Sequence, residues 1–288
     1  MRQLITIFFA IIFIAPARAE VKPWDDAFKK QWYAGLAEIT RYELKQAQYR
    51  GVYDGDAVLI FVTEDFLADK HVKHERGDGP SISVLKLNAM RQFTTGLYPY
   101  SIMTSVFTPV APDQTRTLKV TSTVQEWCGH TFTQINHRDG KYKATLRSYF
   151  QSDGDHDLTL PSTILEDEIW TRIRLAPERL PTGEIQIIPG MLFQRLTHTL
   201  PDVQTANAEL VESGTTRVYT LAYTSIGRKL AITFEKNYPH AILGWEESIQ
   251  RRGRWTTTTA RKTHATMIDY WNKNKVEDIA YRAQLGLK

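Results

Sequence analysis

Cysteine is almost missing from this 288-residue chain, in which Cys128 is the only one. A single cysteine excludes a disulfide-stapled scaffold and a zinc site built from several thiolates. Glycine and proline are also scarce, with 16 and 12 residues, which excludes collagen-like and low-complexity chains. With 42% hydrophobic residues, the chain has the composition of a globular protein and is long enough for one large domain.

Several site motifs are absent as well. The sequence contains no glycine-rich nucleotide loop, no G-x-S-x-G and no H-E-x-x-H. His71, His74 and Glu75 would have the spacing of metal ligands only on a helix, and the glycines and proline that follow them favour a solvated loop. We therefore expect neither a metal site nor a cofactor.

The first nineteen residues have the pattern of a signal peptide. Arg2 precedes an apolar run over residues 4–14, and Ala17-Arg18-Ala19 fits the small-x-small cleavage rule. The run is about half as long as a bilayer-spanning helix, and no other run approaches that length, so we expect no membrane span. We expect cleavage near Ala19, export to the periplasm, and a mature chain that begins at Glu20.

The charge balance excludes a nucleic-acid-binding protein. The chain has 36 Lys and Arg against 32 Asp and Glu, and loss of Arg2 and Arg18 with the signal peptide leaves an excess of only two. Basic and aromatic residues are concentrated in one short segment, which contains Arg251, Arg252 and Arg254 beside Trp245 and Trp255. It predicts either a peripheral contact with anionic lipid or a solvated hairpin tip.

Alternating polar and apolar residues predict a single β-rich domain over residues 20–288. The clearest predicted turn is His137-Arg138-Asp139-Gly140, and the segment 36–49 is expected to close at Gly51 and Asp54-Gly55-Asp56. The predicted strands cover residues 36–49, 57–62, 84–93, 101–110, 118–135, 142–150, 208–212, 217–223, 229–234, 241–250 and 254–266. One internal helix opens at Pro161-Ser162-Thr163 and ends before Pro177, and a C-terminal helix covers residues 270–285. The predicted fold is mainly β (α+β), a large curved antiparallel sheet with these two helices.

Five segments together resemble a known family: residues 33–39, 62–66, 125–130, 164–170 and 180–183. They are similar to exported proteins of Bacteroidetes-type bacteria that are commonly labelled septum formation inhibitor Maf. True Maf proteins are α/β nucleotide pyrophosphatases with a phosphate-binding motif near the N-terminus, and this chain has a signal peptide at that position. The resemblance therefore implies an envelope protein without pyrophosphatase activity.

A weaker resemblance is architectural. Long antiparallel strands with one internal helix are similar to periplasmic β-clam proteins of the lipoprotein-carrier type. In such proteins a curved sheet wraps around a helix and holds acyl chains, so this resemblance implies an apolar ligand between helix and sheet.

Glu126, Cys128 and His130 are the candidate catalytic residues. They alternate on a predicted strand and would therefore share one face. A thiolate–imidazolium pair would require the strand to bend at Gly129, because neighbouring side chains on one face lie about 7 Å apart. The alternative is a packed strand in which Cys128 is mostly buried and unpaired. The acidic run Glu166-Asp167-Glu168 predicts surface charge on the first turns of the internal helix. The alternative is a glycosidase-like carboxylate pair drawn from this run and from Glu246 and Glu247.

Apolar residues at helical spacing predict one stripe on the internal helix. Its members are the candidate ligand-binding residues: Ile164, Leu165, Ile169, Trp170 and Ile173. We expect a periplasmic binding or carrier protein for an acyl-chain ligand. The alternatives are a Cys/His-based envelope enzyme and a cell-division or envelope interaction protein without catalysis.

Overall fold

The computed structural model describes residues 25–77 and 79–287, so the predicted signal peptide, residues 1–19, lies outside the described residues. The strands are β1 (Ala37–Gln48), β2 (Gly51–Leu67), β3 (Val72–Lys73), β4 (Ile82–Thr95), β5 (Tyr98–Pro109), β6 (Lys119–Glu126), β7 (Gly129–Arg138), β8 (Lys141–Ser148), β9 (His156–Pro161), β10 (Ile164–Leu165), β11 (Gly183–Ile188), β12 (Gln204–Ser213), β13 (Thr216–Tyr223), β14 (Arg228–Glu235), β15 (Ile242–Arg251) and β16 (Arg254–Ile268). The helices are α1 (Asp26–Trp32), α2 (Glu166–Leu175), α3 (Met191–Thr197) and α4 (Ala280–Gln284), with 3₁₀ turns η1 (Pro177–Arg179), η2 (Tyr270–Asn272) and η3 (Val276–Ile279).

All sixteen strands of the described residues belong to one sheet, which confirms the predicted large curved antiparallel sheet. The order is β10-β11-β12-β13-β14-β15-β16-β1-β2-β4-β5-β6-β7-β8-β9, with β3 beside β2. Strands β1 and β16 pair in the middle of this order, so the N- and C-terminal parts of the chain join the two halves. Only β10 and β11 pair in parallel among these strands.

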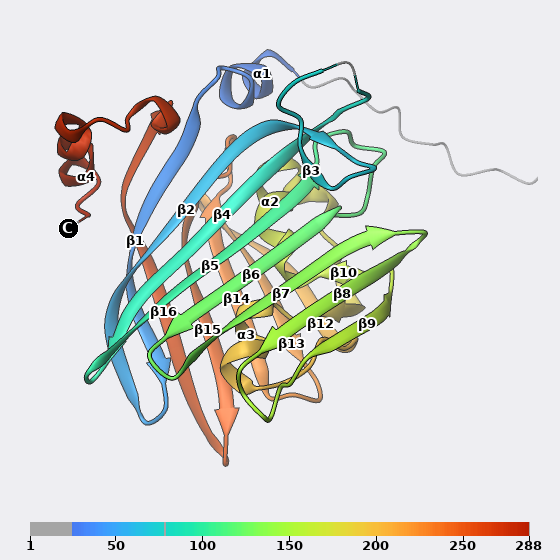
Figure 1. The fold of residues 1–288 in the computed structure, drawn as a ribbon, viewed down its shortest axis with the longest axis vertical. Helices are drawn as coiled ribbons and strands as arrows, with labels where there is room; N and C mark the ends of the chain where they lie inside the picture. The colour runs from blue at the N-terminus through green and yellow to red at the C-terminus, as the bar shows by residue number, and fades with distance from the viewer. Residues whose placement is uncertain (1–24, 78, 288) are drawn as a thin grey trace, which may run out of the picture.

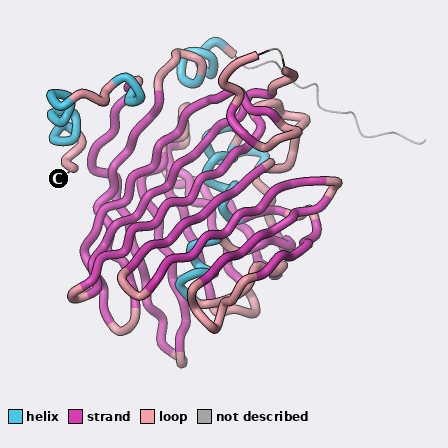
Figure 2. Tube along the Cα trace, in the orientation of Figure 1, coloured by secondary structure: helices cyan, strands magenta, loops and turns pink. Residues whose placement is uncertain are grey.

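The sheet curves around α2 and α3. In Figure 1, β1–β9 form the front of the molecule, β12–β16 lie behind them, and both helices lie between the two halves. Figure 2 shows the same two helices in cyan behind the front strands. Helix α2 contacts β4 and β5, and α3 contacts β5 and β6. The large hydrophobic core lies on this inner face of the sheet.

The helices differ in part from the prediction. Helix α2 begins at Glu166 rather than near Ser162, because Ile164 and Leu165 pair with β11. The sequence pattern missed α1 and α3, which have seven residues each, too few for a clear helical period. The predicted C-terminal helix shrinks to five residues, since side chains such as Asn272 and Asn274 bond within the segment and compete with helical hydrogen bonds. No helix of the described ranges is long and apolar enough to cross a membrane.

One predicted turn is confirmed and one is wrong. Asp139 and Gly140 have φ of 51° and 68° between β7 and β8, as a tight two-residue hairpin requires. The turn between β1 and β2 lies instead at Tyr49, which has φ of 54°, and Gly55 lies inside β2. A Cβ at Gly55 would approach the carbonyl oxygen of Gln92 to 2.3 Å, so glycine is required there by the neighbouring strand.

Candidate functional site

The predicted ligand-binding residues lie on β10 and α2, and they are packed. Leu165, Ile169 and Ile173 have no exposed surface. Ile164 and Trp170 are half-buried and pack against the same core. The stripe covers the inner face of the sheet as its spacing predicts, and it also fills most of the space there. A ligand could reach Leu165, Ile169 and Ile173 only by displacing side chains.

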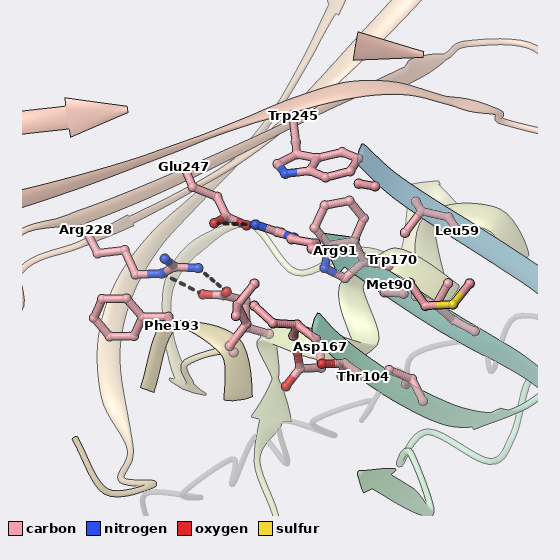
Figure 3. Close-up of a pocket in the computed structure, with 18 residues that line it drawn as sticks. Leu59, Met90, Arg91, Thr104, Asp167, Trp170, Phe193, Arg228, Trp245 and Glu247 are labelled. Atoms are coloured by element: carbon pink, nitrogen blue, oxygen red, sulfur yellow. Dashed lines mark hydrogen bonds and ion pairs between the residues drawn. The ribbon is translucent and has the colours of Figure 1, made fainter. Parts of the chain in front are cut away.

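A small inner cavity remains next to Trp170 (Figure 3), between α2, α3 and strands of both halves of the sheet. Its volume is about 40 Å³. Such a volume holds a few water molecules, whereas small-molecule pockets span roughly 300–1,000 Å³. The inner cavity is therefore too small for an acyl chain in this conformation.

Two buried ion pairs line the inner cavity (Figure 3). Arg228 donates from Nη2 and Nε to the carboxylate of Glu166 on α2. Arg91 on β4 donates to Glu247 on β15, with N–O distances of 2.6 and 3.1 Å. All four residues are buried, so each charge depends on its partner. The pairs connect α2 to the sheet and the two halves of the sheet to each other.

Asp167 lies beside these pairs without a cationic partner of its own in the described part of the chain. Its Oδ2 accepts a hydrogen bond from the backbone N–H of Met191 at 3.0 Å. Burial is the main cause that raises the pKa of Asp167 to about 7, and the nearby negative charge of Glu166 adds to it. The predicted surface position of the acidic run is wrong, because Glu166, Asp167 and Glu168 are all at least nine-tenths buried.

Replacing Asp167 by Asn is expected to raise the free energy of unfolding by about 4 kcal/mol at pH 8 and by less than half as much at pH 5. The ordinary pKa of an aspartate is 3.8 and that of Asp167 is about 7, so the folded protein holds an extra proton between these values. Wild-type stability therefore falls as the pH rises through this window, by about 4 kcal/mol at most. The Asn oxygen still accepts the Met191 N–H but cannot ionise.

Urea unfolding at pH 5, 6, 7 and 8 measures this difference. Asp202→Asn, at an exposed carboxylate, serves as the control and should follow the wild-type pH profile. Parallel pH profiles of the Asp167→Asn variant and the wild type would contradict the assignment.

The candidate catalytic residues lie at an exposed hairpin. Cys128 is exposed in the turn between β6 and β7, so the expectation of a mostly buried thiol on a continuous strand is wrong. Its backbone N–H donates to Glu126 Oε2 at 2.8 Å. His130 is exposed on β7, and within the described residues no hydrogen bond joins it to Cys128. The adjacent Glu126 carboxylate raises the pKa of the Cys128 thiol, which is the opposite of what a nucleophile needs.

Thiol-reactive reagents are expected to label Cys128 in the native protein without denaturant. Replacing Glu126 by Gln should accelerate labelling at pH 7, because loss of the carboxylate lowers the thiol pKa and raises the thiolate fraction. Labelling that appears only on unfolding would contradict the exposed position. Labelling that is abolished in His130→Ala would indicate a catalytic pair instead.

A larger pocket lies on the outer face of the sheet, and we call it the outer pocket. Its volume is about 330 Å³. Its floor is formed by aliphatic side chains of four adjacent strands, and its cover by the C-terminal segment, residues 270–287, which is red in Figure 1. The apolar lining consists of Ile39, Val58, Ile60, Met90, Ile268, Tyr270, Leu285 and Leu287. The same residues form a second hydrophobic cluster, separate from the main core.

Charged groups of β2 and of the C-terminal segment also line the outer pocket. Asp56 pairs with Arg41 at 2.5 Å, and Lys273 pairs with Asp269 at 3.2 Å. Asp278 and Arg282 also line it. Apart from Asp56, the strand residues that line the pocket carry no charge, so the pocket suits a hydrocarbon chain whose polar end lies beside the charged groups.

One sequence signal pointed to the outer pocket. Residues 57–62 form an unbroken apolar run instead of an alternating one. In β2, Ala57 and Leu59 face the inner cavity whereas Val58 and Ile60 face the outer pocket. A strand that reads as continuously apolar is covered on both faces, and this run predicts a second covered face.

The basic and aromatic cluster is divided by the fold. Trp245 is 2% exposed on the inner face, whereas Trp255 is 53% exposed at the hairpin tip. Arg251 donates to the carbonyl of Leu196 at the end of α3. Arg252 and Arg254 remain exposed at the tip, so any lipid contact would involve these two arginines.

Comparison of the chain with protein-family models, with curated proteins and with solved structures found no match in any of the three. The resemblance to the exported Maf-labelled proteins therefore stays a prediction from the sequence.

Proposed function

We propose that the protein binds and carries one acyl chain of a fatty acid or lipid in the outer pocket, after export to the periplasm. The observation that carries this proposal is the pocket of about 330 Å³ between an aliphatic sheet face and the C-terminal segment. This volume falls in the range of small-molecule pockets, roughly 300–1,000 Å³. The proposal keeps the ligand class expected from the sequence and moves its site from the stripe on α2 to the other face of the sheet.

The dimensions of the pocket floor support a chain-shaped ligand. Strands β16, β1, β2 and β4 are consecutive in the sheet. At about 4.8 Å between neighbours they span roughly 14 Å, about the length of a ten-carbon extended chain. Burial of ten methylenes contributes roughly 8 kcal/mol, which corresponds to a micromolar dissociation constant.

The C-terminal segment that covers the outer pocket has features that would allow a ligand to enter and leave. Residues 270–287 contain only short helical turns, and their buried contacts with the sheet are few. Leu285, which is 8% exposed, is the only buried apolar residue of this segment. Val276 and Ile279 face solvent, with 92% and 67% exposure. Segments with so few buried contacts open at low free-energy cost.

Titration with a fluorescent long-chain fatty acid tests the proposal, using the expected mature chain, residues 20–288. We expect saturable binding of one probe per chain in the micromolar range, and displacement by unlabelled fatty acid. Absence of saturable binding, together with absence of co-purifying lipid in mass spectrometry of exported protein, would contradict it. That outcome would favour an interaction protein.

A further inference from the structure

A second pocket is lined by several positively charged residues and shares no residue with the proposed acyl site. We call it the arginine pocket, and its volume is about 260 Å³. It lies where the loop between β5 and β6 meets the end of α2. Three arginines line it: Arg116 from the loop, Arg172 from α2 and Arg179 from η1.

The protein holds two of these arginines in place. Arg172 Nε lies 3.0 Å from Glu168 Oε1, and its Nη2 donates to the carbonyl of Thr115. Arg179 Nη1 donates to the carbonyl of Pro112 at 3.4 Å. Since both backbone carbonyls belong to the loop, these bonds fix the loop and both guanidinium groups as one wall.

Arg116 has no such attachment, because no hydrogen bond or ion pair joins it to another of the described residues. It is only half-exposed, and its positive charge contributes, after burial, to lowering the pKa of His137. Glu168 does not line the pocket: it is fully buried, and its second oxygen accepts the Thr117 N–H at 3.2 Å. The lining therefore holds three positive charges and no carboxylate.

We infer that the arginine pocket binds a phosphate group. Guanidinium groups donate in pairs to phosphate oxygens, and several converging arginines are typical of phosphate sites. Apolar walls stand beside the charges, among them Val110, Ile164 and Leu175. The ligand chemistry is thus a phosphate monoester or diester that carries an apolar group, and the same arginines would hold free phosphate more weakly.

Calorimetric titration of the mature chain in phosphate-free buffer tests the inference with two probes, inorganic phosphate and dihexanoyl phosphatidic acid below its micelle concentration. We expect saturable binding, weakened at least tenfold by Arg116→Gln, a change that removes no internal hydrogen bond. Arg254→Gln, at the exposed hairpin tip, should bind as the wild type does. At least tenfold tighter binding of the lipid would identify a lipid phosphate, and equal affinity would identify free phosphate.

Three results would overturn the inference. The first is no saturable binding of either probe at millimolar concentration. The second is equal affinity of the wild type and Arg116→Gln. The third is an equal loss in Arg254→Gln, which would indicate nonspecific attraction to positive charge. Because the outer pocket contributes no residue to this site, Ile60→Glu should leave phosphate binding unchanged, which separates this test from that of the proposed acyl site.

Discussion

Replacing Glu38 by Ala is expected to lower the free energy of unfolding by about 3–5 kcal/mol, because the change leaves a buried guanidinium without its counter-charge. Arg174 on α2 is fully buried, and its Nη1 and Nη2 lie 2.5 and 2.7 Å from the two carboxylate oxygens of Glu38 on β1. The guanidinium also lies 5.0 Å from the ring centroid of Trp32 and 4.9 Å from that of Phe61.

Two controls separate this effect from a general loss of charge. Asp157→Ala removes the exposed pair with Arg147 and should change stability little, since exposed pairs are screened by solvent. The double change of Glu38 and Arg174 to Met should recover most of the loss, because it removes both buried charges. Urea unfolding at pH 7 measures all three variants. Equal destabilisation by Glu38→Ala and Asp157→Ala would contradict the assignment.

The same pair predicts acid sensitivity. Burial raises the pKa of Glu38, but the charge and hydrogen bonds of Arg174 outweigh it, so the pKa lies below the ordinary value of 4.5. A carboxylate with a lowered pKa contributes stability that is present above its ordinary pKa and is lost as the pH falls below it. Asp167 acts in the opposite direction and destabilises the protein at higher pH. For these two groups, stability should therefore be greatest near pH 4, where the loss from Glu38 at lower pH gives way to the loss from Asp167 at higher pH.

The second large effect is expected at the proposed acyl site. Replacing Ile60 by Glu should weaken fatty-acid binding by about ten- to hundredfold, roughly 1.4–2.8 kcal/mol. Ile60 is half-buried and lines the outer pocket, so the new carboxylate can reach solvent in the free protein but would be desolvated by a bound chain.

Val52→Glu is the matched control for this change. Val52 lies on the same strand as Ile60, eight residues away and therefore on the same face, but it is 59% exposed and does not line the pocket. The control should bind the fluorescent probe with wild-type affinity. Equal affinity of the Ile60→Glu variant and the control would contradict the proposed location.

The fold class was predictable because it depends on local patterns. Alternating residues in segments such as 217–223 report which side of the sheet is buried, and Asp139-Gly140 supplies the positive φ values that a tight hairpin needs. Gly55 shows the limit of this reasoning. In the sequence it looks like a turn glycine. In the structure a glycine is required there because the backbone of β4 lies too close for a side chain, and residues near Gly55 in the sequence do not reveal that contact.

The sites were less predictable because their partners are distant in the chain. The sequence around Glu166 suggests a charge on the protein surface. In the structure Glu166 is buried against Arg228, which lies 62 residues later in the chain. Arg116 and Arg179 likewise meet only through the packing of α2 on the sheet. The outer pocket had a local signal in residues 57–62, but the segment that covers it could not be identified from spacing.

Photolabelling tests the central claim most directly, because it reports both binding and location. A fatty acid with a photoreactive diazirine near its methyl end is bound to the mature chain, irradiated, and the labelled peptides are identified by mass spectrometry. We expect labels on strand residues 58–60 and on residues 268–287, with labelling suppressed by unlabelled fatty acid and in Ile60→Glu. Labels on α2 around Ile169 would contradict the outer pocket as the site, and absence of competable labelling would contradict acyl-chain binding altogether.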